Sequence, residues 1–225
     1  MDYPRARLLR TRKLGVLLQN ARQQAGQSRR ALAQVLGVSS GQLRAYEEGR
    51  KAPSLPELEA VAYVLRVPLE HFWGDKMLEA PLPPQGEPLP AGFLPLRQQQ
   101  VAVLLQQKRE DAGVSATALA RQIALSPRRL QAYEHGERPV PLPVLEDLAD
   151  ALGVPLEHFM DRTGPVGRWR MQQRQVAQFL RLPDDLREFV AQPVNKPYLE
   201  LAQRLSAMSA DHLRSIAESL LEITL

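Results

Sequence analysis

The sequence predicts an all-α protein in which one small helical domain occurs twice and a helical segment follows. Three observations predict this fold class. A stretch of about 60 residues repeats along the chain, apolar residues within it recur at helical spacing, and serines and glycines stand where those helices begin and end.

The repeat aligns at a constant offset of 87 residues, without insertion or deletion. The clearest matches are Ala-Leu-Ala at 31–33 and 118–120, Ala-Tyr-Glu at 45–47 and 132–134, and Val-Pro-Leu-Glu-His-Phe at 67–72 and 154–159. The chain therefore divides into a basic N-terminal arm (1–12), a first copy (13–76), a linker (77–95), a second copy (96–163) and a C-terminal helical segment (164–225).

Each copy carries the signals of five helices. In the first copy Gly26 ends a first helix, Ser28 caps a second, and Ser39 caps a third that ends at Gly49. A fourth helix at about 55–65 and a short fifth at about 68–73 complete the domain. The second copy repeats these signals at Ser115, Ser126, Gly136, 142–152 and 155–160.

The linker contains six prolines and two glycines, a composition that blocks helix and strand pairing. We expect an extended spacer there. At about 3.1 Å per residue it reaches on the order of 60 Å, so the sequence predicts two separately tethered domains.

The second and third helices of each copy form a helix-turn-helix, and the residues resemble those of the phage-repressor and Cro (XRE) family. The resemblance covers about 13–74 and 98–161 and depends on these residues: 28–33, 37–39, Leu43, 46–49 and Pro53, with 115–120, Ser126, Leu130 and 133–136 in the second copy. It implies two repressor-like domains, a prokaryotic transcriptional regulator, double-stranded DNA as the partner and no cofactor.

In that family the helix after the turn lies in the major groove. The resemblance therefore implies DNA contacts from Ser39, Ser40, Gly41, Gln42, Arg44 and Ala45, and from Ser126, Pro127, Arg128, Arg129, Gln131 and Ala132. It adds Arg29 and Thr117 at the start of the preceding helices, and Arg50, Lys51 and Arg138 in the loops that follow. Because Arg pairs with guanine and Gln with adenine, the second copy is the better equipped to read bases.

Other residues of the repeat have expected structural roles. We interpret Leu32, Leu43, Leu119, Leu130, Tyr46 and Tyr133 as core, Glu47 and Glu134 as structural carboxylates, and His71 and His158 as packing rather than metal ligands. The arm residues Arg5, Arg7, Arg10, Arg12 and Lys13 are expected either to lie along DNA phosphates or a minor groove, or to form a disordered basic terminus.

The segment after Gly164 lies outside the repeat and opens with a basic stretch at 168–170. Apolar spacing predicts a helix around Val176 and Phe179, another at 197–208 and a last one capped by Ser209. The last helix places Leu213, Ile216, Ala217, Leu220 and Leu221 on one stripe. We expect that stripe to form a homodimer; packing against the preceding domain is the alternative.

Composition excludes several function classes. The chain has no cysteine, so disulfides, thiolate metal sites and cysteine nucleophiles are impossible. We find no apolar run long enough to span a membrane, no phosphate-binding glycine loop and no metal-ligand spacing. The net charge is +4, but residues 1–51 alone carry +8. We therefore expect no enzyme and no metal, but a soluble, cytoplasmic, nucleoid-associated regulator that reads DNA sequence with two heads; a protein-binding or antitoxin-like adaptor is the alternative.

Overall fold

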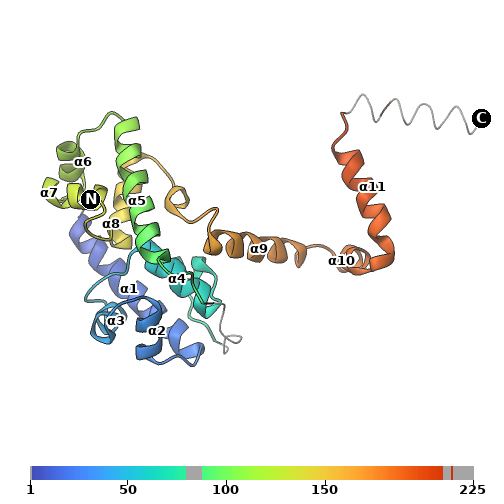
Figure 1. The fold of residues 1–225 in the computed structure, drawn as a ribbon, viewed down its shortest axis with the longest axis horizontal. Helices are drawn as coiled ribbons and strands as arrows, with labels where there is room; N and C mark the ends of the chain where they lie inside the picture. The colour runs from blue at the N-terminus through green and yellow to red at the C-terminus, as the bar shows by residue number, and fades with distance from the viewer. Residues whose placement is uncertain (1, 80–87, 210–213, 215–225) are drawn as a thin grey trace, which may run out of the picture. The chain divides into compact units, whose positions relative to one another are not determined.

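The computed structural model describes residues 2–79, 88–209 and Arg214. Over these residues the chain is all-α, and its helices fall into two units, 1–172 and 173–225 (Figure 1). Unit 1 holds both copies of the repeat.

The two copies have the same order of helices. The first consists of α1 (Tyr3–Gln24), α2 (Arg29–Val35), α3 (Ser40–Glu47), α4 (Leu55–Leu65) and a 3-10 helix, η1 (Leu69–Trp73). The second consists of α5 (Phe93–Asp111), α6 (Ala116–Gln122), α7 (Pro127–Glu134), α8 (Leu142–Leu152) and η2 (Leu156–Phe159). From α2 onward, each helix begins 87 residues before its counterpart, which confirms the register of the repeat.

Serine caps start the short helices as their positions predict. The Ser28 hydroxyl accepts a hydrogen bond from the Ala31 amide at 3.1 Å, and the Ser39 hydroxyl accepts one from the Gln42 amide at 3.1 Å. Ser115 does the same in the second copy. Ser126 occupies the N-cap position of α7, but its side chain makes no capping bond.

One continuous apolar core extends through both copies. The leucines that the sequence assigns to the core, Leu32, Leu43, Leu119 and Leu130, are each no more than 1% exposed. Full burial of a leucine side chain contributes roughly 1.5–3 kcal/mol, so this set holds the helix-turn-helix helices firmly on their domains.

The two copies are joined by ion pairs that follow the repeat register. Arg97 of α5 pairs with Glu59 of α4 at 3.0 Å, and Arg10 of α1 pairs with Glu146 of α8 at 3.0 Å. Arg10 and Arg97 are 87 residues apart, and so are Glu59 and Glu146. Each copy therefore offers the same arginine to the same carboxylate of the other, which is the contact pattern of a two-fold symmetric dimer.

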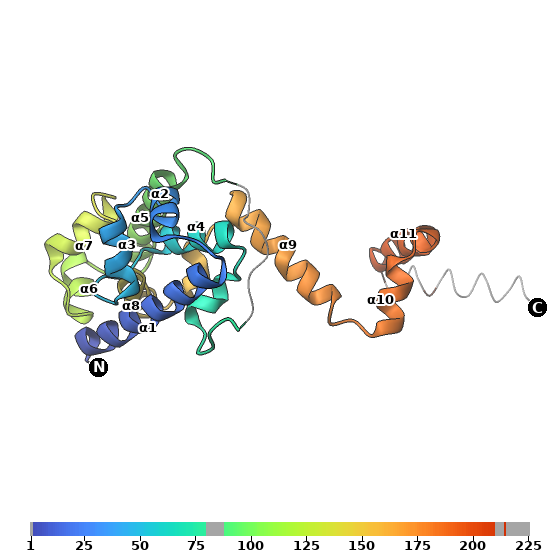
Figure 2. The ribbon, with the colours of Figure 1, turned by 90° about the horizontal axis from the view of Figure 1, so that it is seen from below.

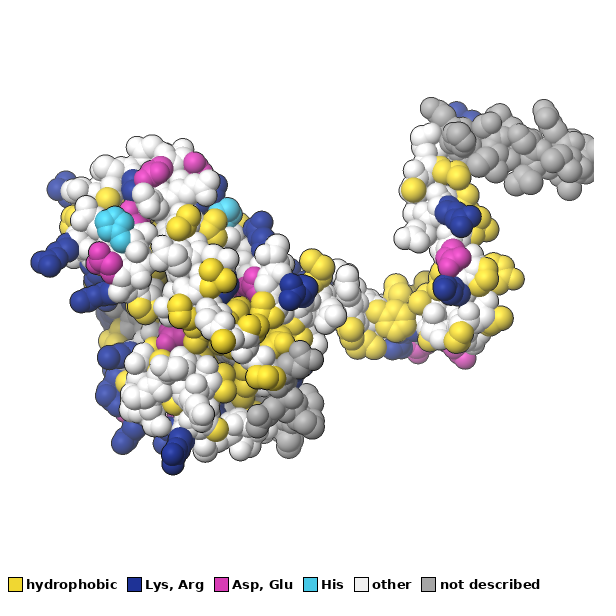
Figure 3. Space-filling model, viewed as in Figure 1, with side chains coloured by type: hydrophobic (Ala, Val, Ile, Leu, Met, Phe, Trp, Pro, Cys, Tyr) yellow, Lys and Arg dark blue, Asp and Glu magenta, His cyan; other side chains and the backbone are white. Residues whose placement is uncertain are grey.

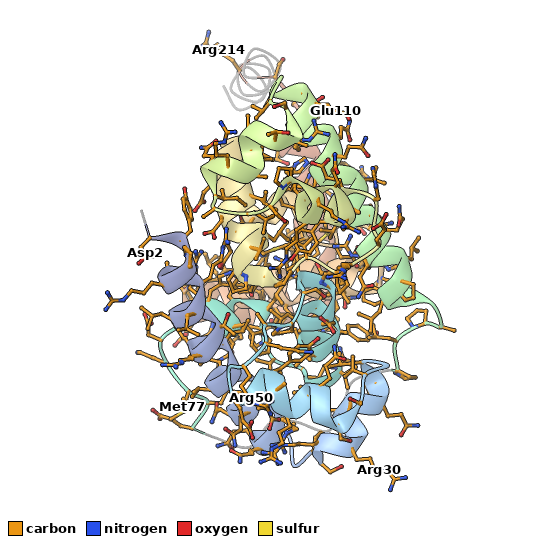
Figure 4. The ribbon with its side chains drawn as sticks, turned by 90° about the vertical axis from the view of Figure 1, so that its left-hand side faces the viewer. Asp2, Arg30, Arg50, Met77, Glu110 and Arg214 are labelled. Carbon is orange, nitrogen blue, oxygen red and sulfur yellow. The ribbon has the colours of Figure 1, made fainter. Side chains whose placement is uncertain are left out.

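A backbone contact lies on the approximate two-fold axis. Ser54 and Pro141, again 87 residues apart, form an antiparallel bridge, and the Leu142 amide donates to the Pro53 carbonyl at 2.9 Å. Figure 4 shows α1 and α5 on opposite sides of unit 1, as this symmetry requires. Unit 1 is thus an intramolecular pseudo-dimer.

This packing differs from the tethered domains that the linker predicts. Residues 80–87 lie outside the described part of the linker, and Leu78 and Leu89 on either side of them pack against the core. Burial at the ion pairs and the core holds the copies together, so the linker does not act as an extended spacer between them.

The N-terminal arm also differs from its prediction. Residues 3–12 form the first half of α1, which Figures 1 and 2 place beside α8. Arg7 bonds Asp147 and the Ile123 carbonyl, and Arg10 bonds Asp147 as well as Glu146. These two arginines join the copies, and Lys13 pairs with Asp75 at 2.6 Å. They are not free to lie along phosphates.

The helix α9 (Pro165–Phe179) begins in unit 1, where Trp169 packs edge-on against Tyr63 with ring centroids 5.8 Å apart. Unit 2 contains α10 (Asp184–Ala191), a 3-10 helix η3 (Pro193–Asn195) and α11 (Lys196–Ser206). The sequence reading omits α10 but predicts α11.

Neither α10 nor α11 has a buried residue. Phe189 and Tyr198 contact each other across the two helices, with ring centroids 6.4 Å apart. The predicted dimerisation residues lie outside the described part of the chain.

Candidate nucleic-acid interface

A tight turn holds the second helix of each motif against the first. In the first copy Gly37 takes a left-handed φ of +61° between α2 and α3. Its counterpart in the second copy is Ala124, which adopts the same region at +52° although it carries a side chain. The turn geometry is therefore kept in both copies, with some backbone strain in the second.

The exposed surface of α3 carries few groups that can read a base. Ser40, Gly41 and Arg44 are exposed, whereas Gln42 is half-buried. Ala45 is only 4% exposed, so the prediction that it touches DNA is wrong: it faces the core side of the helix.

The side chain of Gln42 is already engaged by its own domain. Its amide nitrogen donates to the Tyr46 hydroxyl at 2.6 Å, and that hydroxyl donates to Glu57 at 2.8 Å. Burial raises the pKa of Tyr46, so it stays a neutral donor. Gln42 must give up this bond, or use its remaining groups, to contact a base.

Two further arginines of the first copy share one carboxylate. Glu48 accepts hydrogen bonds from Arg44 at 2.6 Å and from Arg50 at 2.7 Å. These bonds lower the pKa of Glu48, so it remains ionised. All three side chains are exposed. The negative charge of Glu48 therefore lies on the surface beside Arg44 and Arg50, two of the arginines that the sequence assigns to DNA.

The exposed surface of α7 carries more side chains that can pair with a base than that of α3 does. Arg128 and Gln131 are exposed on α7, and their side chains make no hydrogen bond or ion pair with any described residue. Arg129 stacks over Tyr133, and its Nε donates to the Tyr133 hydroxyl at 2.8 Å. The position of Glu48 is held by His135, so the second copy has no counterpart of the ion pairs that Glu48 makes with Arg44 and Arg50.

Buried carboxylates support α3 and α7, the second helices of the two motifs, which we call the recognition helices. Glu47 at the end of α3 is 4% exposed and is held by Arg22, and Glu134 of α7 is held by Arg109 at 2.7 Å. Both glutamates are structural, as the sequence suggests. Each pair ties a recognition helix to the long first helix of its copy.

Arg29 also pairs with the buried carboxylate of Glu47. Its Nε donates to Glu47 at 2.6 Å, while about 44% of its side chain stays exposed. The sequence reading assigns Arg29 to a phosphate and omits this pairing. Thr117, at the next position along the equivalent helix of the second copy, is exposed and uncommitted among the described residues.

A basic cleft lies between the two copies, beside the approximate two-fold axis. It has a volume of about 520 Å³ and is lined by Arg50 and Lys51 of the first copy, Arg129 and Arg138 of the second, and Arg7 of α1. Lys51 and Arg138 are equivalent in the repeat. Arg7 is held by Asp147, so we call the other four side chains, Arg50, Lys51, Arg129 and Arg138, the dyad cluster.

Glu57 is the one carboxylate among the residues that line the cleft, and Arg50 of the dyad cluster also pairs with Glu48 outside that lining. Glu57 caps α4 through the Ser54 amide at 2.7 Å and accepts the Tyr46 hydroxyl. Lys and Arg side chains gather along the side of unit 1 where α1, α3, α6 and α7 lie (Figures 1 and 3). Figure 4 faces this side.

Of the predicted site residues, the structure brings Arg50, Lys51, Arg129 and Arg138 together at the cleft. Sequence reasoning places Arg7 in an arm and so omits it from this set. Its offset partner, Leu94, is apolar, so the repeat gave no signal for it.

The fold and this surface define a protein with two helix-turn-helix domains in one chain. A family model described as a helix-turn-helix domain matches residues 13–72 and 100–159. The two matches are offset by 87 residues and cover more than half of the chain, so the chain belongs to this family. Comparisons with curated proteins and with solved structures find no match. None of the helices described here is both long enough and apolar enough to cross a membrane.

Proposed function

We propose that this protein is a sequence-specific transcriptional regulator of the phage-repressor type, which binds double-stranded DNA with two reading heads per chain. The observation that carries the proposal is the pair of exposed recognition helices, α3 and α7, with the dyad cluster between them. Duplex DNA attracts such a basic surface through its phosphates and is read through base edges in its major groove.

The reading residues have separate roles in this proposal. Arg128 and Gln131 read bases from α7, because a free guanidinium pairs with guanine and a free amide with adenine. Arg50, Lys51 and Arg138 contact phosphates, which fixes register without carrying sequence information. The first copy, with Ser40 and Gly41 at the start of α3, depends more on phosphates.

Unit 2 supports a second candidate function. Its helices carry exposed apolar residues, namely Leu186, Phe189, Val190, Tyr198 and Leu201. A surface of this kind suits a protein contact. A homodimer through the C-terminal helices is one proposal for its use; an adaptor that binds another protein, through this surface or through the sparse face of α3, is the alternative.

The test is selection of bound duplexes from a random pool by the full-length chain at low salt. We expect one motif to be enriched, and Arg128→Ala with Arg129→Ala to weaken part of it. The matched control is Arg162→Ala with Arg168→Ala, which removes the same charge at the junction of η2 and α9. If no motif is enriched, the regulator proposal fails and a protein partner is favoured.

A further inference from the structure

We infer that a single chain reads both halves of one operator as a rigid pseudo-dimer, and that this operator is an imperfect palindrome with one fixed half-site spacing. The inference rests on the proposed function. It adds the form of the DNA partner: two unlike half-sites, related by an approximate dyad that falls at the bridge between Ser54 and Pro141.

The two copies are related by an approximate two-fold axis. Arg10 to Glu146 and Arg97 to Glu59 are the same contact made in both directions, and the bridge joins a residue to its own counterpart. Reciprocal contacts of this kind arise only when two copies are related by a two-fold rotation. Because duplex DNA has two-fold symmetry of its own, a pseudo-dimer suits two inverted half-sites rather than two direct repeats.

A buried ion-pair network holds the two copies in one fixed arrangement. Glu59 is fully buried and Arg97 is 4% exposed. The carboxylate also accepts the Asp161 amide at 2.6 Å, and the guanidinium donates to the Phe159 carbonyl at 2.8 Å. A buried network with its partners in place holds one arrangement, because any slip would leave a charge unpaired. The distance between the recognition helices is therefore fixed.

Basic side chains from both copies line the cleft beside the approximate two-fold axis. Lys51 and Arg138, which are equivalent in the two copies, both line the cleft beside the Ser54–Pro141 bridge. A duplex lying across α3 and α7 would bring the phosphates at its centre to this cleft. The dyad cluster accordingly joins two reading heads into one continuous basic surface.

The two recognition helices carry different side chains at equivalent positions. In the repeat, Gly41 of the first copy corresponds to Arg128 of the second, and Arg44 corresponds to Gln131. Different side chains at the base edges select different bases. A symmetric operator would therefore mismatch one head, and the preferred site has unlike halves.

The rival arrangement is a conventional dimer in which two chains each apply α7. It would prefer a perfect palindrome of the half-site read by the second copy, and two chains would occupy each duplex. The two arrangements thus differ in the symmetry of the preferred DNA and in stoichiometry, both of which can be measured.

The experiment uses the full-length chain and fluorescent duplexes built from the motif that selection enriches. Three duplexes carry the enriched site and its two symmetrised forms, and two more carry the enriched site with its centre lengthened or shortened by about two base pairs. We expect one chain per duplex, tightest binding to the imperfect site, and a loss of tenfold or more for each altered duplex, as even one mismatched base pair costs about 5- to 150-fold.

A variant assigns the halves. Arg128→Ala should lose discrimination in one half-site only, whereas a conventional dimer would lose it in both. The matched control is Arg121→Ala, an exposed arginine of α6. Tightest binding to a perfect palindrome with two chains, or equal binding at all spacings, overturns the inference and leaves the proposed function standing. Failure of selection to enrich any motif overturns the proposed function, and the inference with it.

Discussion

Arg97 and Glu59 form a buried ion pair between the two helix-turn-helix copies, with Arg97 Nη2 3.0 Å from Glu59 Oε2. Burial raises the pKa of Glu59, which the opposing arginine and the Asp161 amide counteract. Arg97→Met would leave the carboxylate buried without its partner. We expect it to lower the free energy of unfolding by about 3–5 kcal/mol, measured by urea titration.

Two controls separate the pair from the packing around it. Glu59→Leu combined with Arg97→Met removes both charges and should recover most of the loss, since an apolar pair often replaces a buried ion pair without cost. Arg10→Met removes the equivalent, one-third exposed arginine and should cost less. A double variant no more stable than Arg97→Met would contradict the coupling.

Gly15 allows α1 to lie close to α3. A methyl group at this position would approach the Tyr46 carbonyl oxygen to 2.4 Å, although the equivalent residue in the second copy is Ala102. We expect Gly15→Ala to destabilise the protein by about 1–3 kcal/mol in thermal unfolding, because α3 must move. Gly41→Ala, where the nearest atom is 3.8 Å away, should leave stability unchanged or slightly raised. Equal effects would rule out the close contact.

Arg128 and Arg138 should affect DNA binding in different ways. Arg128→Ala is expected to cost about 1–3 kcal/mol and to relax preference at one base, because its free guanidinium is placed to read a base edge. Arg138→Ala should weaken binding to all sequences and reduce the slope of log affinity against log salt by about 1. Fluorescence anisotropy at several salt concentrations measures both, and identical salt slopes would contradict the division of roles.

Glu48→Gln is expected to strengthen DNA binding several-fold at low salt. The substitution removes the carboxylate that holds Arg44 and Arg50, so both arginines become available to phosphates. Glu110→Gln, in an exposed carboxylate of α5, is the control. It lies away from Arg50 in Figure 4. An equal gain from both variants would indicate a general charge effect.

Two histidines should make stability fall under mild acid. Burial lowers the pKa of His71 and of His158, so the unfolded chain binds their protons more readily than the folded chain. Their contribution is fully present above the ordinary pKa of about 6.5 and is lost below it, as pH falls through the lowered pKa of the folded chain. His71→Gln with His158→Gln should flatten the decline in melting temperature between about pH 7.5 and 5.5. His135→Gln, an exposed control, should retain the wild-type slope.

Much of the fold was predictable from local signals. The offset of 87 residues fixed the two domains, and serine caps such as Ser28 and Ser39 fixed the starts of short helices, because a capping hydroxyl acts on an amide three residues away. Burial of Ala45 was not predicted. It directly follows the exposed Arg44 on α3, and an alanine does not by itself indicate whether its position is buried or exposed. The reading surface of α7 was the easier to recognise, because its residue types are those that pair with bases.

The packing of the copies was not predictable in the same way. Arg10 and Arg97, with Glu59 and Glu146, were visible as repeated charges, but repetition alone does not distinguish a solvated pair from a contact between copies. A proline-rich linker sets only the longest separation that two domains can reach. Whether the two domains separate depends on the free energy of contact between surfaces that are distant in sequence. No local sequence pattern indicates that free energy.

The Ser54–Pro141 bridge has a consequence for how such a protein can diverge. When two identical subunits meet on an axis, one codon change alters both halves of the assembly. Here the residues on either side of the axis, and the two heads beyond it, are encoded separately. If the chain binds DNA as proposed, one half can acquire a new preference while the other keeps its old one, and binding specificity can change one half-site at a time.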